Sequence, residues 1–139
     1  MKELLIKVLA LLGIAQAGAP LQEGQQAYLF SLKNHEGKTV NLSDYRGKWV
    51  VLYFFPKAFT PGCTAESCSL RDGFDGLRSL DAVVIGVSTD DLETQRKFKE
   101  KYALPFELIA DSDKRVVKAY DVSGMFGFAK RRTFIIDPK

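Results

Sequence analysis

The sequence predicts one α/β domain built on a central β-sheet with helices packed against it. Residues 49–55 and 82–87 are β-branched and aromatic runs without polar alternation, as expected of strands covered on both faces. Segments with apolar residues at helical spacing separate the strand-like runs, and this alternation is typical of an α/β sheet. With 139 residues, the chain is long enough to bury a core without disulfide bonds.

The segment before the first buried strand predicts a small hairpin. Residues 28–32 form a short apolar stretch that ends at the turn signal of residues 34–37. Residues 39–42 alternate polar and apolar side chains, as a half-buried edge strand does. We expect residues 43–47 to form a loop or a single helical turn.

The buried strand at residues 49–55 is expected to end at Pro56. A helix over residues 63–80 should follow, because Leu70, Phe74 and Leu77 lie four and three positions apart. The remaining expected elements, in chain order, are a strand at 82–87, a helix from capping candidates at 88–91 to residue 102, a strand at 106–109, a helix capped by Asp111 or Ser112 and containing Val116, Val117 and Tyr120, a Gly-rich loop at 123–128, and a strand at 133–137.

Residues 1–20 differ from the rest of the chain and resemble a short secretory signal. Two lysines precede an apolar run at 8–15, and small residues in an A-x-A pattern follow, although Glu3 is unfavourable in the basic segment. The apolar run is shorter than the roughly 20 residues that span a bilayer, so no stable membrane span is expected. The hypothesis is export, with a domain at 21–139; the alternative is an extra amphipathic helix on a cytoplasmic protein.

Charge and cysteine content argue against two classes of function. The net charge is +3 and the densest basic run, residues 130–132, is too short for a nucleic-acid-binding face. Two cysteines cannot supply the four ligands of a structural zinc site, and the single histidine, His35, lies far from them in sequence. Nothing in the sequence therefore indicates a metal site.

The segment around Cys63 is the most informative. A buried strand ends, a loop follows, and a helix begins with Pro61 at its first position, Thr60 as its cap and Cys63 in its first turn. In open α/β sheets, ligands usually bind at this edge, where strands lead into helices. The N–H groups and positive dipole end of a helix stabilise an anion such as a thiolate.

A thiolate at this position would be a nucleophile suited to attack on a hydroperoxide. A free thiol has a pKa of about 8.5, so only a small fraction is thiolate at neutral pH. Orientation of the peroxide must supply most of the acceleration, and both peroxide oxygens need hydrogen-bond donors. The candidates are the Thr60 hydroxyl, backbone N–H groups near Gly62 and an arginine.

The second cysteine, Cys68, follows five positions later. In an ideal helix such residues have Cα atoms about 8.7 Å apart, whereas a disulfide needs about 4.4–6.8 Å. A bond between Cys63 and Cys68 therefore requires the first turns to unwind, which suits a pair that alternates between thiol and disulfide. The alternatives are two cysteines buried as apolar packing, or a static loop disulfide in an exported protein.

The spacing Pro56-x3-Thr60-x2-Cys63 resembles the active-site motif of peroxiredoxins. With Cys68 five residues after Cys63, the segment is similar to the peroxiredoxin Q class, also called bacterioferritin comigratory proteins. The similarity covers the chain from residue 21 onward and includes residues 37–48, 86–88 and 131–137. The resemblance implies a thioredoxin-like fold with a central mixed sheet and helices on both faces, here without the family's C-terminal strand and helix.

The resemblance also implies a role for each motif residue. Cys63 would be the peroxidatic cysteine and Cys68 the resolving one. Thr60 would bind the peroxide and hold the thiolate, Pro56 would shield the pocket, and Arg131 would stabilise the thiolate and the charge developing on the peroxide. Arg131 is preferred to the adjacent Arg132 because it matches the family pattern Arg-x-(Thr/Ser)-Phe, and because adjacent strand residues face opposite sides.

Other residues have less certain assignments. Glu66 either orients Arg131 or simply favours the helix N-terminus. Trp49, Phe54, Phe55 and Phe59 are expected in the core, with Phe55 and Phe59 as candidates for the pocket edge. Residues 26–30 depart from the family's Ala-Pro-(Asp)-Phe, so the N-terminal hairpin is expected to pack differently.

Taken together, these features predict a thiol-dependent peroxidase that reduces hydrogen peroxide and organic hydroperoxides. The resemblance implies reduction of the disulfide by thioredoxin or a similar dithiol protein, no metal or organic cofactor, and a monomer rather than a dimer. One rival is a thioredoxin-type oxidoreductase, which would favour Cys-x-x-Cys over the Cys-x4-Cys found here. The other is a non-catalytic redox-sensing module.

Overall fold

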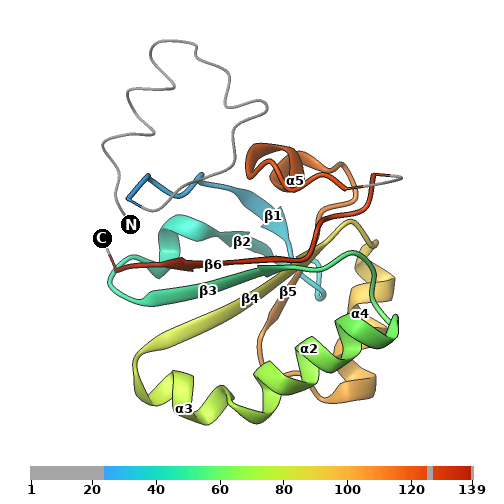
Figure 1. Cartoon of the computed structure of the whole chain (residues 1–139), viewed down its shortest axis with the longest axis horizontal. Coiled ribbons are helices and arrows are strands. Elements are labelled where there is room, and N and C mark those ends of the chain that lie inside the picture. Colours follow the sequence, from blue (N-terminus) through green and yellow to red (C-terminus); the bar gives the residue numbers. More distant parts are fainter. Residues whose placement is uncertain (1–23, 125–126, 139) are drawn as a thin grey trace.

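The computed structural model describes residues 24–124 and 127–138. Its centre is a four-stranded sheet in the order β5 (Glu107–Ala110), β4 (Ala82–Ser88), β3 (Trp49–Phe54), β6 (Arg132–Ile136). Strands β3, β4 and β5 run parallel to one another, and β6 pairs antiparallel with β3. The mixed α/β sheet expected from the sequence is therefore confirmed, with both predicted buried strands at its centre (Figure 1).

Helices α2 (Pro61–Asp72), α3 (Phe74–Ser79) and α4 (Leu92–Tyr102) lie on one face of the sheet. The other face carries the hairpin of β1 (Ser31–Lys33) and β2 (Thr39–Asn41), the 3₁₀ helix η1 (Leu42–Tyr45), and α5 (Arg115–Ala119) (Figure 1). Because side chains alternate along a strand, β3 contributes to both apolar cores. Val50, Leu52 and Phe54 pack with the hairpin side, while Val51 and Tyr53 pack with the helical side.

Several element boundaries differ from the expected ones. The helix predicted over residues 63–80 is two helices, because the chain breaks at Gly73. Asp91 caps α4 as expected, its side chain accepting a hydrogen bond of 2.8 Å from Thr94 N. Helix α5 begins later than predicted: its N-cap residue is Lys114, not Asp111 or Ser112, although the Asp111 carboxylate accepts a hydrogen bond of 2.8 Å from Val117 N.

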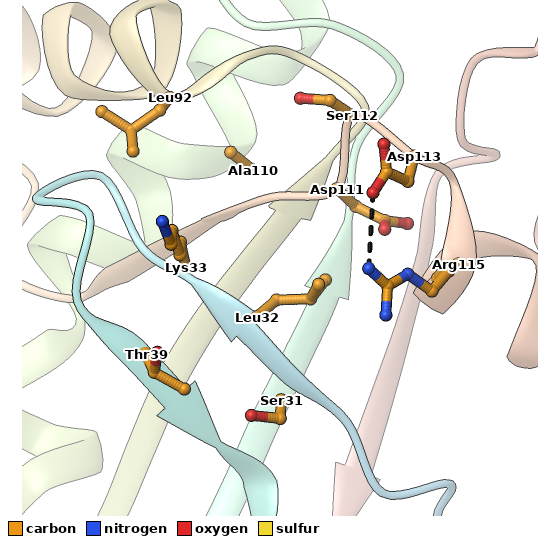
Figure 2. Close-up of a pocket in the computed structure, with 10 residues that line it drawn as sticks. All are labelled: Ser31, Leu32, Lys33, Thr39, Leu92, Ala110, Asp111, Ser112, Asp113 and Arg115. Carbon is orange, nitrogen blue, oxygen red and sulfur yellow. Dashed lines mark hydrogen bonds and ion pairs between the residues drawn. The ribbon is translucent and has the colours of Figure 1, made fainter.

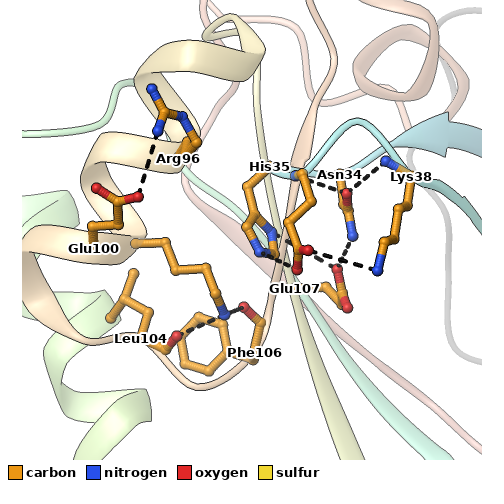
Figure 3. Close-up of polar contacts among 10 residues, drawn as sticks. Asn34, His35, Lys38, Arg96, Glu100, Leu104, Phe106 and Glu107 are labelled. Atoms are coloured by element: carbon orange, nitrogen blue, oxygen red, sulfur yellow. Dashed lines mark hydrogen bonds and ion pairs between the residues drawn. The ribbon is translucent and has the colours of Figure 1, made fainter.

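A polar cluster joins the hairpin to strand β5. Asn34 Nδ2 donates to Glu107 Oε2 at 2.6 Å, and the backbone N–H of His35 donates to the Leu108 carbonyl at 2.9 Å. The buried His35 ring lies between the carboxylates of Glu107 and Glu36, with Nδ1 3.8 Å from the former and Nε2 3.2 Å from the latter (Figure 3). The N-terminal hairpin is therefore anchored to the sheet edge opposite β6.

Two expectations fall on residues outside the described part. The proposed leader at residues 1–20 lies there, and so do residues 125–126 of the Gly-rich loop. No helix of the described residues is both long enough and apolar enough to cross a membrane.

The burial of His35 predicts a pH dependence of stability. Burial, reinforced by the Lys99 ammonium, lowers the pKa of His35 below its ordinary value of 6.5, and Glu107 and Glu36 offset this only in part. Below pH 6.5 the unfolded chain therefore binds a proton that the folded chain resists, and the free energy of unfolding falls as the pH decreases through this window.

Urea unfolding of wild type and His35→Gln between pH 7.5 and 5.5 measures this contribution. We expect the wild type to lose more stability than the variant over this range. Since the carboxyl groups titrate in both proteins, the difference isolates the histidine. Equal losses in the two proteins would contradict the assignment.

Candidate active site

Cys63 lies in the first turn of α2, where the parallel strand β3 has ended and the chain turns back over the sheet. Thr60 adopts an extended backbone (φ −78°, ψ 150°), Pro61 occupies the first helical position, and the Thr64 N–H donates to the Thr60 carbonyl at 2.9 Å. The Cys63 side chain is fully buried, with 0% of its surface exposed, and its thiol is free. The predicted strand, loop and helix N-terminus are therefore confirmed.

Thr60 is the N-cap residue of α2, as expected, but its side chain makes no capping hydrogen bond. Its hydroxyl donates to the Lys57 carbonyl at 2.7 Å, across the loop that precedes α2. Because that bond uses the single hydroxyl proton, the lone pairs of Thr60 Oγ1 remain able to accept a hydrogen bond. Thr60 is thus an acceptor at this edge, rather than the donor suggested by the sequence.

Arg131, the residue before β6, reaches Cys63 across the sheet edge. Its Nη2 donates to Cys63 Sγ at 3.3 Å and its Nη1 donates to Glu66 Oε1 at 3.0 Å. A Cβ atom at Gly62 would lie 2.8 Å from Arg131 Nη2, so glycine gives the guanidinium room to approach. The predicted approach of Arg131 to Cys63 agrees with this geometry. Of the two hypotheses for Glu66, the contact supports the one in which Glu66 orients Arg131 over the one in which it only favours the helix N-terminus.

The pKa values of Arg131 and Glu66 depend on each other. Burial disfavours a charged guanidinium, but its contacts with Cys63 and Glu66 outweigh that effect and raise the pKa of Arg131. Burial also raises the pKa of Glu66 above its ordinary value, while the Arg131 charge partly opposes the change. The guanidinium and the Glu66 carboxylate are therefore coupled beside the buried Cys63 sulfur.

The neighbouring Arg132 has a different environment. Its guanidinium carbon lies 5.8 Å from the centre of the Phe134 ring, on the β6 strand, and the residue pairs with Phe54 in the sheet. Neither of its described contacts involves Cys63. The choice of Arg131 over Arg132 therefore agrees with the geometry.

Asp90 supports the loop before α2 and was missed as a site residue. Its Oδ2 accepts hydrogen bonds from Ala58 N at 2.8 Å and from the Ser88 hydroxyl at 2.7 Å. Residues 88–91 were expected only to cap the following helix. A signal was available, since these polar residues follow β4, whose carboxyl end lies beside that of the parallel strand β3.

The other predicted site and core residues differ in how far they are buried. Pro56 is half-buried and Phe55 is fully buried, while Phe59 is 41% exposed and has left-handed φ of 68°. The Phe59 ring packs against Phe98 of α4 with ring centres 5.2 Å apart. Trp49 is 44% exposed, so its assignment to the core was wrong; it begins β3 at the sheet end opposite Cys63.

Cys68 lies one and a half turns after Cys63 in the same helix, half-buried and also free. Both sulfurs therefore belong to an intact helix, as the spacing predicted. Between them, Ser67 is fully buried and its Oγ lies 2.9 Å from the Tyr53 hydroxyl oxygen of β3.

Two surface hollows lie elsewhere on the domain, and no predicted site residue lines either. One, of about 410 Å³, lies between the β1–β2 hairpin and the start of α5, with Leu32, Asp111 and Arg115 on its wall (Figure 2). The other, of about 330 Å³, is bordered by His35, Phe74 and Glu107. Among residues 24–124 and 127–138, no group of three or more His, Cys, Asp or Glu side chains is placed to hold a metal ion.

Comparison with known proteins gives a consistent relationship. Residues 23–139 match the AhpC/TSA family. The chain is 48% identical over 124 residues to peroxiredoxin Bcp of Bacillus subtilis, covering 84% of this chain and 79% of that protein. It is 41% identical over 121 residues to the chloroplastic peroxiredoxin Q of Suaeda salsa, covering 86% of this chain and 56% of that protein.

Solved structures agree with the sequence relatives. Peroxidoxin BcpB from Mycobacterium tuberculosis superposes with a TM-score of 0.76 at 33% identity, over 83% of this chain and 78% of that chain. A bacterioferritin comigratory protein from Xanthomonas campestris, studied for its alkyl peroxide reduction activity, gives a TM-score of 0.74 at 30% identity, over 78% and 74%. The chain therefore belongs to the AhpC/TSA family, as a thiol peroxidase of the Bcp and peroxiredoxin Q class of peroxiredoxins.

Proposed function

We propose that this protein reduces hydrogen peroxide and organic hydroperoxides with Cys63 as the attacking thiolate. The observation that carries the proposal is the Arg131 guanidinium, which donates to Cys63 Sγ at 3.3 Å at the N-terminus of α2. Glu66 holds the other nitrogen of the fork at 3.0 Å, so the positive charge keeps its position while the sulfur changes state. The arrangement suits a nucleophile that must be anionic and still buried.

In the first step, the Cys63 thiolate attacks the nearer peroxide oxygen. The S–O bond forms and the O–O bond breaks, leaving Cys63 as a sulfenic acid. The leaving oxygen takes up a proton and departs as water or an alcohol. Arg131 stabilises the charge that moves from sulfur to that oxygen, which is the effect expected of a donor aimed at the transition state.

We assign the peroxide contacts to the edge residues around Cys63. Thr60 Oγ1 already donates to the Lys57 carbonyl, so it is free to accept the O–H of a hydroperoxide. The N–H groups near Gly62 supply donors of the helix N-terminus, and the half-buried Pro56 limits access of water. Asp90 acts indirectly, by holding Ala58 and hence the loop.

In the second step, Cys68 resolves the sulfenic acid. Its thiolate attacks the Cys63 sulfur, the S–S bond forms and the S–O bond breaks, and the departing hydroxide takes up a proton and leaves as water. Since both residues lie in α2, the helix must first unwind to bring their Cα atoms within about 4.4–6.8 Å. A dithiol protein, thioredoxin or one similar to it, then reduces the disulfide by exchange.

Removing each cysteine separates the two steps. With one equivalent of hydrogen peroxide and no oxygen, the wild type should lose two hydrogens in intact mass and form a Cys63–Cys68 disulfide. Cys68→Ser should stop at a sulfenic acid, trapped by a dimedone adduct, and Cys63→Ser should remain unmodified. Oxidation of Cys63→Ser at the wild-type rate would contradict the assignment of the nucleophile.

Replacing each arginine tests the origin of the reactivity. Arg131→Ala should slow Cys63 oxidation by about 10²-fold, the usual effect of removing one donor from a developing charge. Arg132→Ala, a matched neighbour that stacks on Phe134, should change the rate less than about twofold. Rapid-quench intact mass at several peroxide concentrations gives both second-order rate constants. Similar losses in the two variants would show that general charge, not the contact with sulfur, matters.

A further inference from the structure

A buried pair of hydroxyl groups joins the sheet to the helix that carries both cysteines. Tyr53 Oη of β3 and Ser67 Oγ of α2 lie 2.9 Å apart, and both residues are 0% exposed. The peroxide step uses neither hydroxyl. Because a buried hydroxyl is expensive to leave without a partner, this hydrogen bond is a specific tie between the two elements.

The Tyr53 ring has little freedom to follow the helix. Its strand neighbour is Gly86 of β4, where an added Cβ would lie 2.7 Å from Tyr53 Cζ, so the ring lies over the glycine. Phe55 stacks against the ring with centres 5.4 Å apart, and Phe106 meets it edge-on at 5.8 Å. Burial also raises the pKa of the Tyr53 hydroxyl well above its ordinary value, so the phenol stays protonated.

Ser67 occupies a decisive position in α2. It follows Cys63 by four residues, about one helical turn, and directly precedes Cys68. Unwinding that brings Cys68 toward Cys63 must therefore move Ser67. Since the Tyr53 ring is held by the sheet, that movement separates the two hydroxyl groups.

We propose that the Tyr53–Ser67 hydrogen bond is a latch that keeps α2 helical and thereby sets how fast Cys68 reaches oxidised Cys63. The inference rests on the proposed two-step function and adds two positioning residues to its second step. The latch contacts neither the peroxide nor a reacting sulfur. It acts on the equilibrium between the helical state, in which the sulfurs are apart, and the unwound state, in which they meet.

The latch also sets the competition that follows the first step. The Cys63 sulfenic acid either condenses with Cys68, releasing water, or reacts with a second hydroperoxide to give sulfinic acid and an alcohol or water. A more stable helix delays condensation and exposes the sulfenic acid to the second reaction for longer. A weaker latch should therefore protect the enzyme from overoxidation.

Ser67→Ala removes the latch from the helix side. The Tyr53 hydroxyl then lacks a partner in the helical state, which should favour unwinding and speed disulfide formation by about tenfold, the factor equivalent to about 1.4 kcal/mol. The rate of Cys63 oxidation should stay within about twofold of wild type. Ser69→Ala is the matched control, because Ser69 directly follows Cys68 in the same helix but is exposed. It should leave the rates of Cys63 oxidation and of disulfide formation unchanged.

Tyr53→Phe removes the same hydrogen bond from the sheet side, so the proposal remains testable if Ser67→Ala folds poorly. It removes the buried phenol, and Ser67 can still bond to a carbonyl one turn back in the helix, so a smaller acceleration is expected. In the Tyr53→Phe background, Ser67→Ala should add less than about twofold, because the bond is already absent.

Rapid-quench intact mass of each reduced protein with hydrogen peroxide measures the disulfide and sulfinic products over time. We expect Ser67→Ala to form disulfide faster and to need proportionally more peroxide for half-conversion to sulfinic acid. Equal disulfide rates in wild type, Ser67→Ala and Ser69→Ala would overturn the latch alone. A wild type that oxidises at Cys63 but never forms a disulfide would overturn the resolving step and the latch with it.

Discussion

The hydrogen bond from Arg131 to the Cys63 sulfur is the contact on which the rest of the site depends. It joins two segments far apart in sequence, and only the antiparallel pairing of β6 with β3 brings them together. Gly62 leaves room for the guanidinium, and Glu66 holds its second nitrogen. The guanidinium thus places a positive charge against a fully buried sulfur, which is the arrangement that the proposed reaction of Cys63 requires.

The same helix imposes the opposing constraint. In its intact form, α2 presents its N-terminal N–H groups beside Cys63 and keeps Cys68 away from it. In the proposed mechanism, one geometry therefore serves the attack on peroxide and another serves the disulfide. The Tyr53–Ser67 hydrogen bond ties α2, between the two cysteines, to a ring that packs over Gly86. In the proposed mechanism, the stability of this part of α2 sets how the oxidised enzyme divides between disulfide and sulfinic acid.

Local patterns in the sequence predicted most of the framework. The uninterrupted apolar runs identified β3 and β4, and Pro61 located the start of α2. The family resemblance selected Arg131, whose contact with Cys63 no helical or strand periodicity could reveal. The sequence did not predict the break at Gly73, because glycine is tolerated inside many helices and tertiary packing decides its role. The Thr60 partner and the Tyr53–Ser67 pair depend on the spacing of elements in three dimensions, so they emerged only from the structure, whereas the place of Asp90 after β4 was a signal in the sequence.

The unwinding of α2 between the two steps can be measured by amide hydrogen exchange. The comparison is between the reduced protein and the form oxidised by one equivalent of hydrogen peroxide. Both forms share the same chain, so differences in protection report the helix itself. We expect residues 64–68 to be protected in the reduced form and to lose that protection in the disulfide form, while β3 and β4 remain protected in both. A Cys63–Cys68 disulfide that forms with the protection of α2 unchanged would contradict the claim that the helix must unwind between the two steps.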